Sequence, residues 1–227
     1  MLAVATALDA KDLDLRQVSA ALKQLKGSET IEIRHAASLH GFCAGLKQGE
    51  YDIIGDAGDY LGVLNDGATI RVTGNVGNYV GDNMTRGLIV VEGNAGLAAG
   101  VYPYGGTLLI RGSAGDFTAT MNKGATIIVC GDVGDETATY HLAGDLIVVG
   151  NAGLNFGNFL IRGNLYIGGA FKSQGHNTRV EPLTKDDEQK LHRLFEQFDV
   201  PAEVSRFRKL VAETAKPFYG RIIKRRE

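Results

Sequence analysis

The sequence predicts an all-β solenoid: a right-handed parallel β-helix of about seven 19-residue coils, with capping α-helices at both termini. Glycine is about twice as frequent as in average proteins, with 31 of 227 residues, while proline is scarce with 4. Of these glycines, 29 lie between Ala36 and Gly175. Within that stretch the tetrad Gly-(Asp/Asn/Ser)-(Ala/Val)-Gly recurs every 19 residues, beginning at Gly55, Gly74, Gly93, Gly112, Gly131 and Gly150.

The residues before each tetrad have the pattern of a β-strand. In six five-residue segments the second and fourth residues are aliphatic in every copy. Alternate residues of a strand face the same side, so the two columns predict one continuous interior. The second members are Ile70, Ile89, Leu108, Ile127, Leu146 and Leu165, and the fourth are Val72, Val91, Ile110, Val129, Val148 and Ile167. A unit of 19 residues has no room for a strand and a helix, so each unit is one coil, and the coils span residues 31–182.

Glycine is expected at the corners of each coil, because it adopts the positive φ angles that a sharp turn demands. The residues that follow the first glycine, such as Asp56 and Asn75, fit the same corner since Asp and Asn tolerate the left-handed region. The predicted turn motif comprises Gly55, Gly58, Gly62, Gly74, Gly77, Gly81, Gly93, Gly96, Gly100, Gly112, Gly115, Gly131, Gly134, Gly150, Gly153 and Gly157.

Residues 1–30 are expected to form an N-terminal helical cap. Leu15, Val18, Leu22 and Leu25 recur at helical spacing before Gly27, a typical helix stop. The pair Ile31 and Ile33 alternates one residue out of phase with the later strands, which predicts an irregular first coil.

Residues 183–227 are expected to form a C-terminal helical extension. Thr184 followed three residues later by Asp187 is a capping-box start for one helix. Val204, Phe207 and Val211 lie on one side of a further predicted helix over 203–214. Helices at the two ends would cover strand edges that otherwise invite aggregation.

The middle residue of each strand points outward, and most of these residues are apolar. Such a stripe is too large to be left in water. Two interpretations remain open: the protein's own terminal segments cover the stripe, or it is an interface with another protein. The candidate interface residues are Val90, Leu109, Ile128, Ile147 and Tyr166.

No residue is expected to be catalytic, and no metal site is expected on this chain. His35, His40 and Cys43 lie close together but lack a metal-ligand spacing, which favours a packed loop. No phosphate-binding glycine fingerprint occurs. Two carboxylate pairs, Asp56 with Asp59 and Asp132 with Asp135, are explained by the preference of corners for Asp and Asn. His141 and His176 have no visible base or nucleophile partner.

Composition excludes several classes of protein. A net charge of −2 gives no electrostatic case for nucleic acid or a membrane surface. No apolar run approaches the ~18 residues that span a bilayer. Two cysteines exclude a disulfide scaffold, and together with the absence of a signal-peptide pattern they predict a cytoplasmic protein.

The repeat resembles a known family. Gly74-Asn75-Val76-Gly77-Asn78-Tyr79-Val80-Gly81 is similar to the GXGXG β-helix domain. That domain is the C-terminal domain of the large subunit of glutamate synthase. It also forms the C subunit of formylmethanofuran dehydrogenase and of its formyltransferase/hydrolase relatives. The stretch 40–62 looks closest to the glutamate synthase branch. Similar stand-alone chains of about this length occur there as one subunit of N-methylglutamate synthase.

The resemblance implies a scaffold in a hetero-oligomer rather than an enzyme by itself. Glutamate synthase uses an N-terminal Cys nucleophile, whereas this chain begins Met1-Leu2 and has no cysteine cluster for iron–sulfur ligation. The implied partners are an amidotransferase-like subunit and an FMN-containing glutamate synthase-like subunit, which would carry the FMN and any iron–sulfur clusters. The implied reaction converts methylamine and L-glutamate to N-methyl-L-glutamate and ammonia. A formylmethanofuran dehydrogenase-type subunit and a stand-alone β-helix enzyme remain alternatives.

Overall fold

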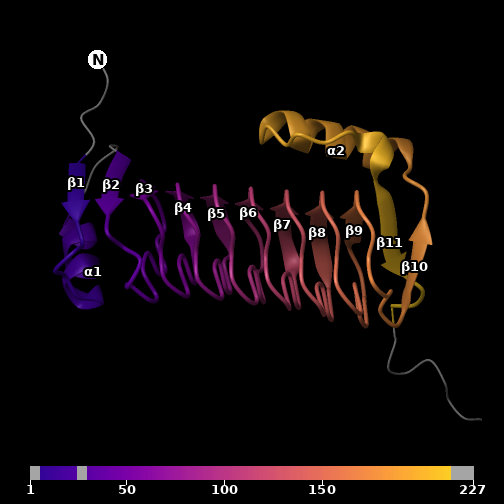
Figure 1. Cartoon of the computed structure of the whole chain (residues 1–227), viewed down its shortest axis with the longest axis horizontal. Coiled ribbons are helices and arrows are strands. Elements are labelled where there is room, and N and C mark those ends of the chain that lie inside the picture. Colours follow the sequence, from indigo (N-terminus) through magenta and orange to yellow (C-terminus); the bar gives the residue numbers. More distant parts are fainter. Residues whose placement is uncertain (1–5, 25–29, 216–227) are drawn as a thin grey trace, which may run out of the picture.

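A computed structural model describes residues 6–24 and 30–215, which form a β-solenoid of about seven turns (Figure 1), as predicted. One eleven-stranded sheet runs along the described part of the rod in the order β1-β2-β3-β4-β5-β6-β7-β8-β9-β11-β10. The strands are β1 (Thr6–Asp9), β2 (Thr30–Arg34), β3 (Glu50–Ile54), β4 (Asp66–Val72), β5 (Arg86–Val91), β6 (Thr107–Ile110), β7 (Lys123–Val129), β8 (Ala143–Val148), β9 (Asn164–Ile167), β10 (Thr178–Glu181) and β11 (Arg208–Ala212). The helices are α1 (Leu15–Gln24), α2 (Lys185–Gln197) and a 3-10 turn, η1 (Val204–Arg206).

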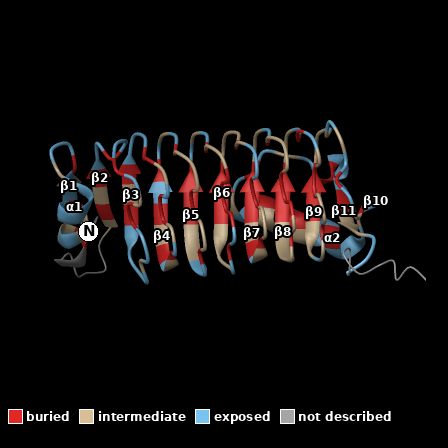
Figure 2. Ribbon diagram, turned by 90° about the horizontal axis from the view of Figure 1, so that it is seen from below, coloured by how far each residue is buried: buried red, intermediate tan, exposed pale blue. Residues whose placement is uncertain are grey.

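The two aliphatic columns form the interior, as predicted. Strands β1 to β9 pair in parallel, and from β3 onward each residue of the columns pairs with the residue 19 positions later. All twelve column residues are fully buried, which appears as red bands across β4–β9 in Figure 2. A second, minimal ladder of parallel bridges joins the small apolar corner residues from Ala57 to Ala152. The hydrophobic pattern therefore determines the register of the coils.

The first coil is irregular in length, as predicted, but its strand is in phase with the later strands. Ile31 pairs with Tyr51, twenty residues on, whereas Tyr51 pairs with Ile70, nineteen on. One extra residue in the first coil restores the phase, and Ile31 and Ile33 face the same interior as the later columns.

The polar corner residues form a hydrogen-bonded ladder rather than left-handed turns. None of the five Asx residues after the first glycine of a tetrad has a positive φ. Instead the Asp56 Oδ1 accepts the backbone N–H of Asn75 at 2.7 Å, and the Asn75 Oδ1 accepts that of Asn94 at 2.9 Å. The ladder continues through Ser113, Asp132 and Asn151. A side-chain oxygen is required here because it satisfies a backbone donor of the next coil, and the Ser113 hydroxyl serves as well as an amide or a carboxylate.

Most glycines of the turn motif are required by close contact between coils, not by positive φ. Positive φ occurs at Gly55 and at the third glycine of each copy, for example Gly62 with φ +65°. Gly77 has no positive φ, but a Cβ there would overlap the Asp59 carboxylate and lie 2.7 Å from the Asp59 backbone N. The motif glycines without positive φ all bring a Cβ within 3.0 Å of the preceding coil, and they are Gly58, Gly74, Gly77, Gly93, Gly96, Gly112, Gly115, Gly131, Gly134, Gly150 and Gly153.

Two successive coils place a buried polar side chain at the same position inside the solenoid. The Asn122 side-chain amide donates a hydrogen bond to the Ala125 carbonyl and accepts one from the Ala125 backbone N–H. His141 occupies the equivalent position one coil later, where its Nε2 donates to the Gly144 carbonyl at 3.3 Å. Its Nδ1 is buried and has no hydrogen-bond partner among the described residues. Burial lowers the pKa of His141 to about 4.

Replacing His141 by Asn is expected to remove a pH dependence of stability. The buried imidazole stays neutral down to about pH 4, whereas the unfolded chain binds a proton near its ordinary pKa of about 6.5. The stabilisation is complete above pH 6.5 and is lost as the pH falls from 6.5 to 4. The free energy of unfolding, measured in urea, should therefore be about 2 to 3 kcal/mol lower at pH 4.5 than at pH 7. His141→Asn should lose much less, because Asn122 shows that an amide fits this position. The control is His192→Gln, at an exposed histidine. If the free energy of unfolding falls equally with pH in His141→Asn and in this control, His141 is not a buried neutral group.

The two ends of the rod are closed differently. At the N-terminal end α1 packs Val18 and Leu22 into the core, and β1 pairs with β2. At the other end β11 lies between β9 and β10 and pairs antiparallel with both. The helix predicted over 203–214 is therefore wrong: only η1 is helical there. Gly27, the predicted helix stop, lies outside the described residues.

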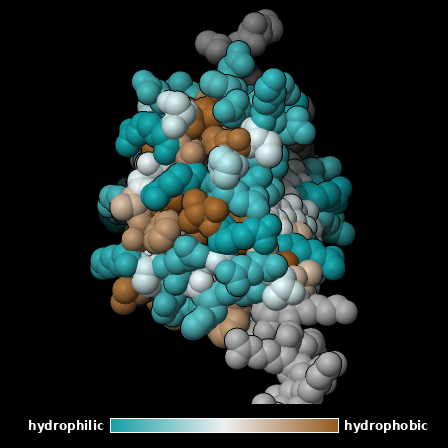
Figure 3. Space-filling view, turned by 90° about the vertical axis from the view of Figure 1, so that its right-hand side faces the viewer, coloured by the Kyte–Doolittle hydropathy of each residue, from teal (hydrophilic) through white to brown (hydrophobic). Residues whose placement is uncertain are grey.

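The outer edge of the C-terminal end is protected from pairing. β10 is four residues long, and its Arg179 forms an ion pair with Glu181 at 2.7 Å. Figure 3 looks onto this end, where hydrophilic side chains predominate around small hydrophobic patches. Short, charged edge strands oppose end-to-end association.

Candidate interaction surfaces

The predicted interface stripe is covered by the chain itself. Within the described residues, the outward residues of β5–β9 pack against α2 and the segment after it. Of the two interpretations that the sequence leaves open, the structure has cover by the chain's own C-terminal segment and not the external interface. Ile128, Ile147 and Tyr166 are fully buried. The cluster contains Val90, Leu109, Ile128, Ile147 and Tyr166 from the strands and Leu191, Phe195, Val200, Val204 and Phe207 from the cover. Apolar burial explains the stripe without a partner.

Helix α2 forms where the sequence predicts it. The Thr184 Oγ1 accepts the backbone N–H of Asp187, and the Asp187 carboxylate accepts the backbone N–H of Thr184, which completes a capping box. Leu191 and Phe195 face the sheet one turn apart. Figure 1 shows α2 lying along one side of the rod, with the turns of the coils bare on the other side.

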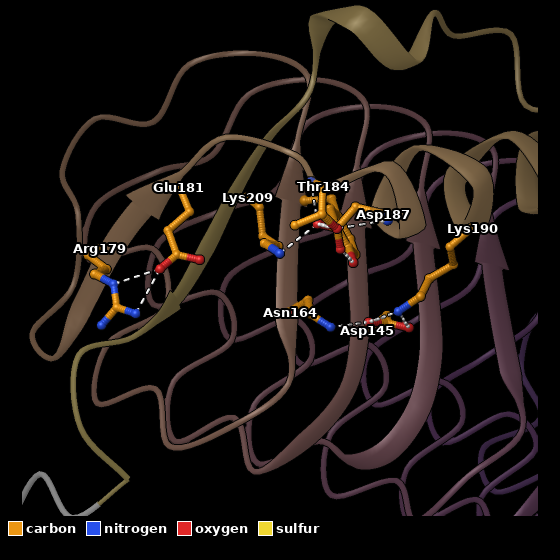
Figure 4. Close-up of polar contacts among 9 residues, drawn as sticks. Asp145, Asn164, Arg179, Glu181, Thr184, Asp187, Lys190 and Lys209 are labelled. Atoms are coloured by element: carbon orange, nitrogen blue, oxygen red, sulfur yellow. Dashed lines mark hydrogen bonds and ion pairs between the residues drawn. The ribbon is translucent and has the colours of Figure 1, made fainter.

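Buried polar contacts attach α2 to the sheet (Figure 4). The Asp187 carboxylate accepts hydrogen bonds from the Tyr166 hydroxyl at 2.7 Å and the Lys209 ammonium at 2.6 Å. Burial alone would raise the pKa of Asp187, but the bonds from Lys209, the Thr184 backbone and Tyr166 outweigh it and hold the pKa well below its usual range. A second ion pair joins Lys190 of α2 to Asp145 of β8 at 3.0 Å. Because these charges are paired and bonded, α2 meets the sheet without leaving an uncompensated buried charge.

A second surface, which the sequence analysis missed, lies on the coils away from α2. We call it the turn face, and it comprises residues 59–66 and the equivalent segments 78–85, 97–104, 116–123, 135–142 and 154–161. In each segment three alternate residues have positive φ, as at Tyr60, Gly62 and Leu64. The first and third side chains point outward and the second position faces the interior, with Tyr60 40% and Leu64 55% exposed while Gly62 is buried.

Aromatic side chains recur in the two outward columns of the turn face. Tyr60 stacks on Tyr79 with ring centroids 4.7 Å apart, and Tyr140 stacks on Phe159 at 5.4 Å. Phe117 is 44% exposed. The 19-residue frame aligns these rings, so reading every column of the repeat, and not only the strand columns, would have found them.

Carboxylates accompany the aromatic side chains. The turn face contains six acidic residues, Asp59, Asp66, Asp82, Asp116, Asp135 and Glu136, and one basic residue, Lys123. Beside it an open depression of about 340 Å³ is lined by Asp116, Asp132, Asp135, Asn151 and Lys172, among others. The surface is therefore acidic as well as apolar.

The residues considered for chemistry lie apart from one another or form ordinary structural contacts. The His35 Nδ1 lies 2.8 Å from the Asp9 carboxylate, and the His40 Nδ1 lies 3.5 Å from that of Asp59. Cys43 is buried, and burial raises the pKa of its thiol. His176 packs against the ring of Phe159.

The carboxylate pairs at the corners belong to the backbone ladders. Asp56 and Asp132 accept N–H groups of the next coil, as do Asp59 and Asp135. Within 6–24 and 30–215, no three His, Cys, Asp or Glu side chains are arranged as ligands of one metal ion. The helices of the same residues are too short or too polar to cross a bilayer.

These features define a class: a parallel β-solenoid with a glycine-based corner motif, whose polar side chains serve mainly to stack one coil on the next. The particular family follows from comparison. The model of the GXGXG motif family matches residues 30–215, and the chain belongs to that family. A comparison with curated proteins gives no match.

Proposed function

We propose that the chain is a non-catalytic scaffold subunit of a glutamate synthase-like complex in the cytoplasm, and specifically of N-methylglutamate synthase. The observation that carries the proposal is the family match over 30–215, across a rod whose polar side chains serve mainly its own ladders and the attachment of α2. A scaffold requires a rigid body with accessible sides. Coils joined to both neighbours by backbone hydrogen bonds supply the rigidity, and the turn face supplies an accessible side.

The chemistry belongs to the partner chains in this proposal. An amidotransferase-like subunit and an FMN-containing glutamate synthase-like subunit would carry the nucleophile, the FMN and any iron–sulfur clusters. Together they would convert methylamine and L-glutamate to N-methyl-L-glutamate and ammonia. Support comes from this chain's own titratable groups: His35, His40 and Asp59 sit in exposed surface contacts, and His141 is enclosed in the core.

Native purification from the source organism is expected to return this chain together with the two partner subunits. The purified complex should form N-methyl-L-glutamate from methylamine and L-glutamate, and the isolated chain should not. Mass spectrometry identifies the co-eluting chains, and omission of methylamine is the control for product formation.

Three other results would overturn the proposal. Elution as a stable monomer would remove the scaffold role. Co-elution with a metal-dependent amidohydrolase-like chain would identify a formylmethanofuran dehydrogenase-type complex instead. Activity of the isolated chain on a polysaccharide would make it a stand-alone β-helix enzyme.

A further inference from the structure

The turn face combines aromatic and carboxylate side chains along six successive coils, on a side of the rod that α2 leaves bare. We propose that it docks a partner protein whose surface presents lysine and arginine side chains around an apolar centre. The inference rests on the proposed function, because the partner is the subunit that the scaffold holds. It adds which face is used and the chemistry of the surface that binds it.

The aromatic side chains stand at positions where the backbone disfavours them. Tyr60, Tyr102 and Phe117 all have positive φ, which strains a bulky side chain and suits Asn much better. The same two columns contain Asn83 and Asn155, so the coil accepts Asn at these positions. Folding of the rod therefore does not require the rings. Exposed aromatic side chains are instead enriched at the centres of protein interfaces.

The charge of the turn face selects the kind of partner. The turn face has six carboxylates and one lysine, Lys123, whose ammonium lies 4.0 Å from the centroid of the Tyr104 ring. Of the six, Asp66 is already paired with Arg86, next to the turn face, at 2.9 Å, so five carboxylates against one lysine carry the excess of negative charge. An acidic surface repels nucleic acid and anionic lipid, and it attracts a basic protein surface. The adjoining depression is lined by three carboxylates, Asp116, Asp132 and Asp135, against one ammonium, Lys172, and so also has an excess of negative charge for a partner's lysine or arginine.

The packing of the rings disfavours a sugar ligand. Tyr60 and Tyr79 lie parallel within 5°, and Tyr140 and Phe159 within 13°. Their faces are thus turned toward one another along the rod, and their edges point outward. A sugar stacks on a ring face, whereas apolar protein side chains also pack against ring edges.

The first experiment uses substitutions that the repeat itself already contains. Tyr60→Asn/Tyr102→Asn/Phe117→Asn introduces the residue found elsewhere in the same columns, so the full chain should melt at an unchanged or higher temperature. In native purification the tagged variant should retain roughly tenfold less of each co-eluting subunit that contacts the turn face. A matched control on the exposed side of α2, Arg193→Gln/Glu196→Gln, should retain the subunits like the wild type.

A second variant tests the charge. Asp59→Asn/Asp116→Asn/Asp135→Asn removes three negative charges and keeps the ladder, because the equivalent Asn78 accepts the N–H of Leu97 at 2.8 Å. Partner retention should fall, and the remaining association should depend less on NaCl concentration. Wild-type retention by both turn-face variants would overturn the inference.

Site-specific cross-linking identifies what lies on the face. With benzoylphenylalanine in place of Phe117, irradiation of the native complex should join this chain to a peptide of another subunit that contains lysine or arginine. The same group in place of Arg193 is the control. A cross-link to a second copy of this chain, a cross-link to this chain's own residues, or no cross-link at 117 would overturn the inference.

The outcomes separate this inference from the proposed function. A basic peptide cross-linked on an amidohydrolase-like chain would support the docking face and overturn the N-methylglutamate synthase proposal. A glutamate synthase-like complex that cross-links only at position 193 would support the proposed function and overturn the docking face.

Discussion

Replacing Ile147 by Asp is expected to destabilise the chain by at least about 4 kcal/mol. Ile147 is fully buried in β8, between Ile128 and Tyr166 and within the cluster that holds Leu191 and Phe195 of α2. The substitution removes apolar contacts and places a carboxylate where the cluster offers apolar neighbours, and domains of this kind are stable by only about 5–15 kcal/mol. The sequence-based interface interpretation predicts the opposite, a stable chain that merely loses its partner.

Urea unfolding of the full chain, with Arg71→Ser as the matched variant, measures this effect. Arg71 occupies the same column in β4 but is exposed beyond the cover of α2. Its ion pair with Glu50 is solvent-exposed, and its contact with the Asp52 Oδ1 is long at 3.7 Å, so Arg71→Ser should change stability by no more than about 1 kcal/mol. A loss below about 1 kcal/mol for Ile147→Asp would show that α2 does not cover the stripe in solution.

The coils were predictable because one short period repeats without insertion through six tetrads. Side-chain alternation then assigns the interior residues, since only one phase buries both aliphatic columns. The alternation of Ile31 and Ile33 also predicted that the first coil is irregular. It did not show that one extra residue keeps the first strand in phase, because the pairing of Ile31 with Tyr51 is a long-range contact that local alternation does not reveal.

The C-terminal region shows where local pattern fails. Val204, Phe207 and Val211 fit one side of a helix, yet β11 is a strand because the open edge of β9 supplies backbone partners for it. Satisfying a sheet edge outweighs a helical periodicity of only three residues. Similarly, the outward stripe predicts that something covers it, but the sequence alone does not distinguish α2 from another protein.

The candidate docking face was missed for a different reason. Its rings occupy left-handed positions within turns, and turn columns carry no burial signal of the kind that identifies strands. The column containing Tyr60, Tyr79 and Phe117 becomes visible only when the turns are aligned at 19-residue intervals. The acidic residues beside it resembled ordinary corner residues, and several of them, including Asp59 and Asp135, do serve the ladder as well.

Replacing Gly77 by Ala is expected to destabilise the chain by about 3 kcal/mol, although Ala is compatible with the backbone angles of Gly77. The added Cβ would meet the Asp59 carboxylate and backbone and lie 2.9 Å from the carbonyl carbon of Gly58. Relief requires the coils to separate, which strains the bond from Gly77 N–H to the Ala57 carbonyl at 3.1 Å. Gly45→Ala is the comparison: Gly45 has φ +61° and open space around the Cβ position, so only backbone strain of about 1 kcal/mol is added. Thermal unfolding of both variants measures the difference, and a smaller loss for Gly77→Ala than for Gly45→Ala would show that dihedral strain, not contact between coils, requires the motif glycines.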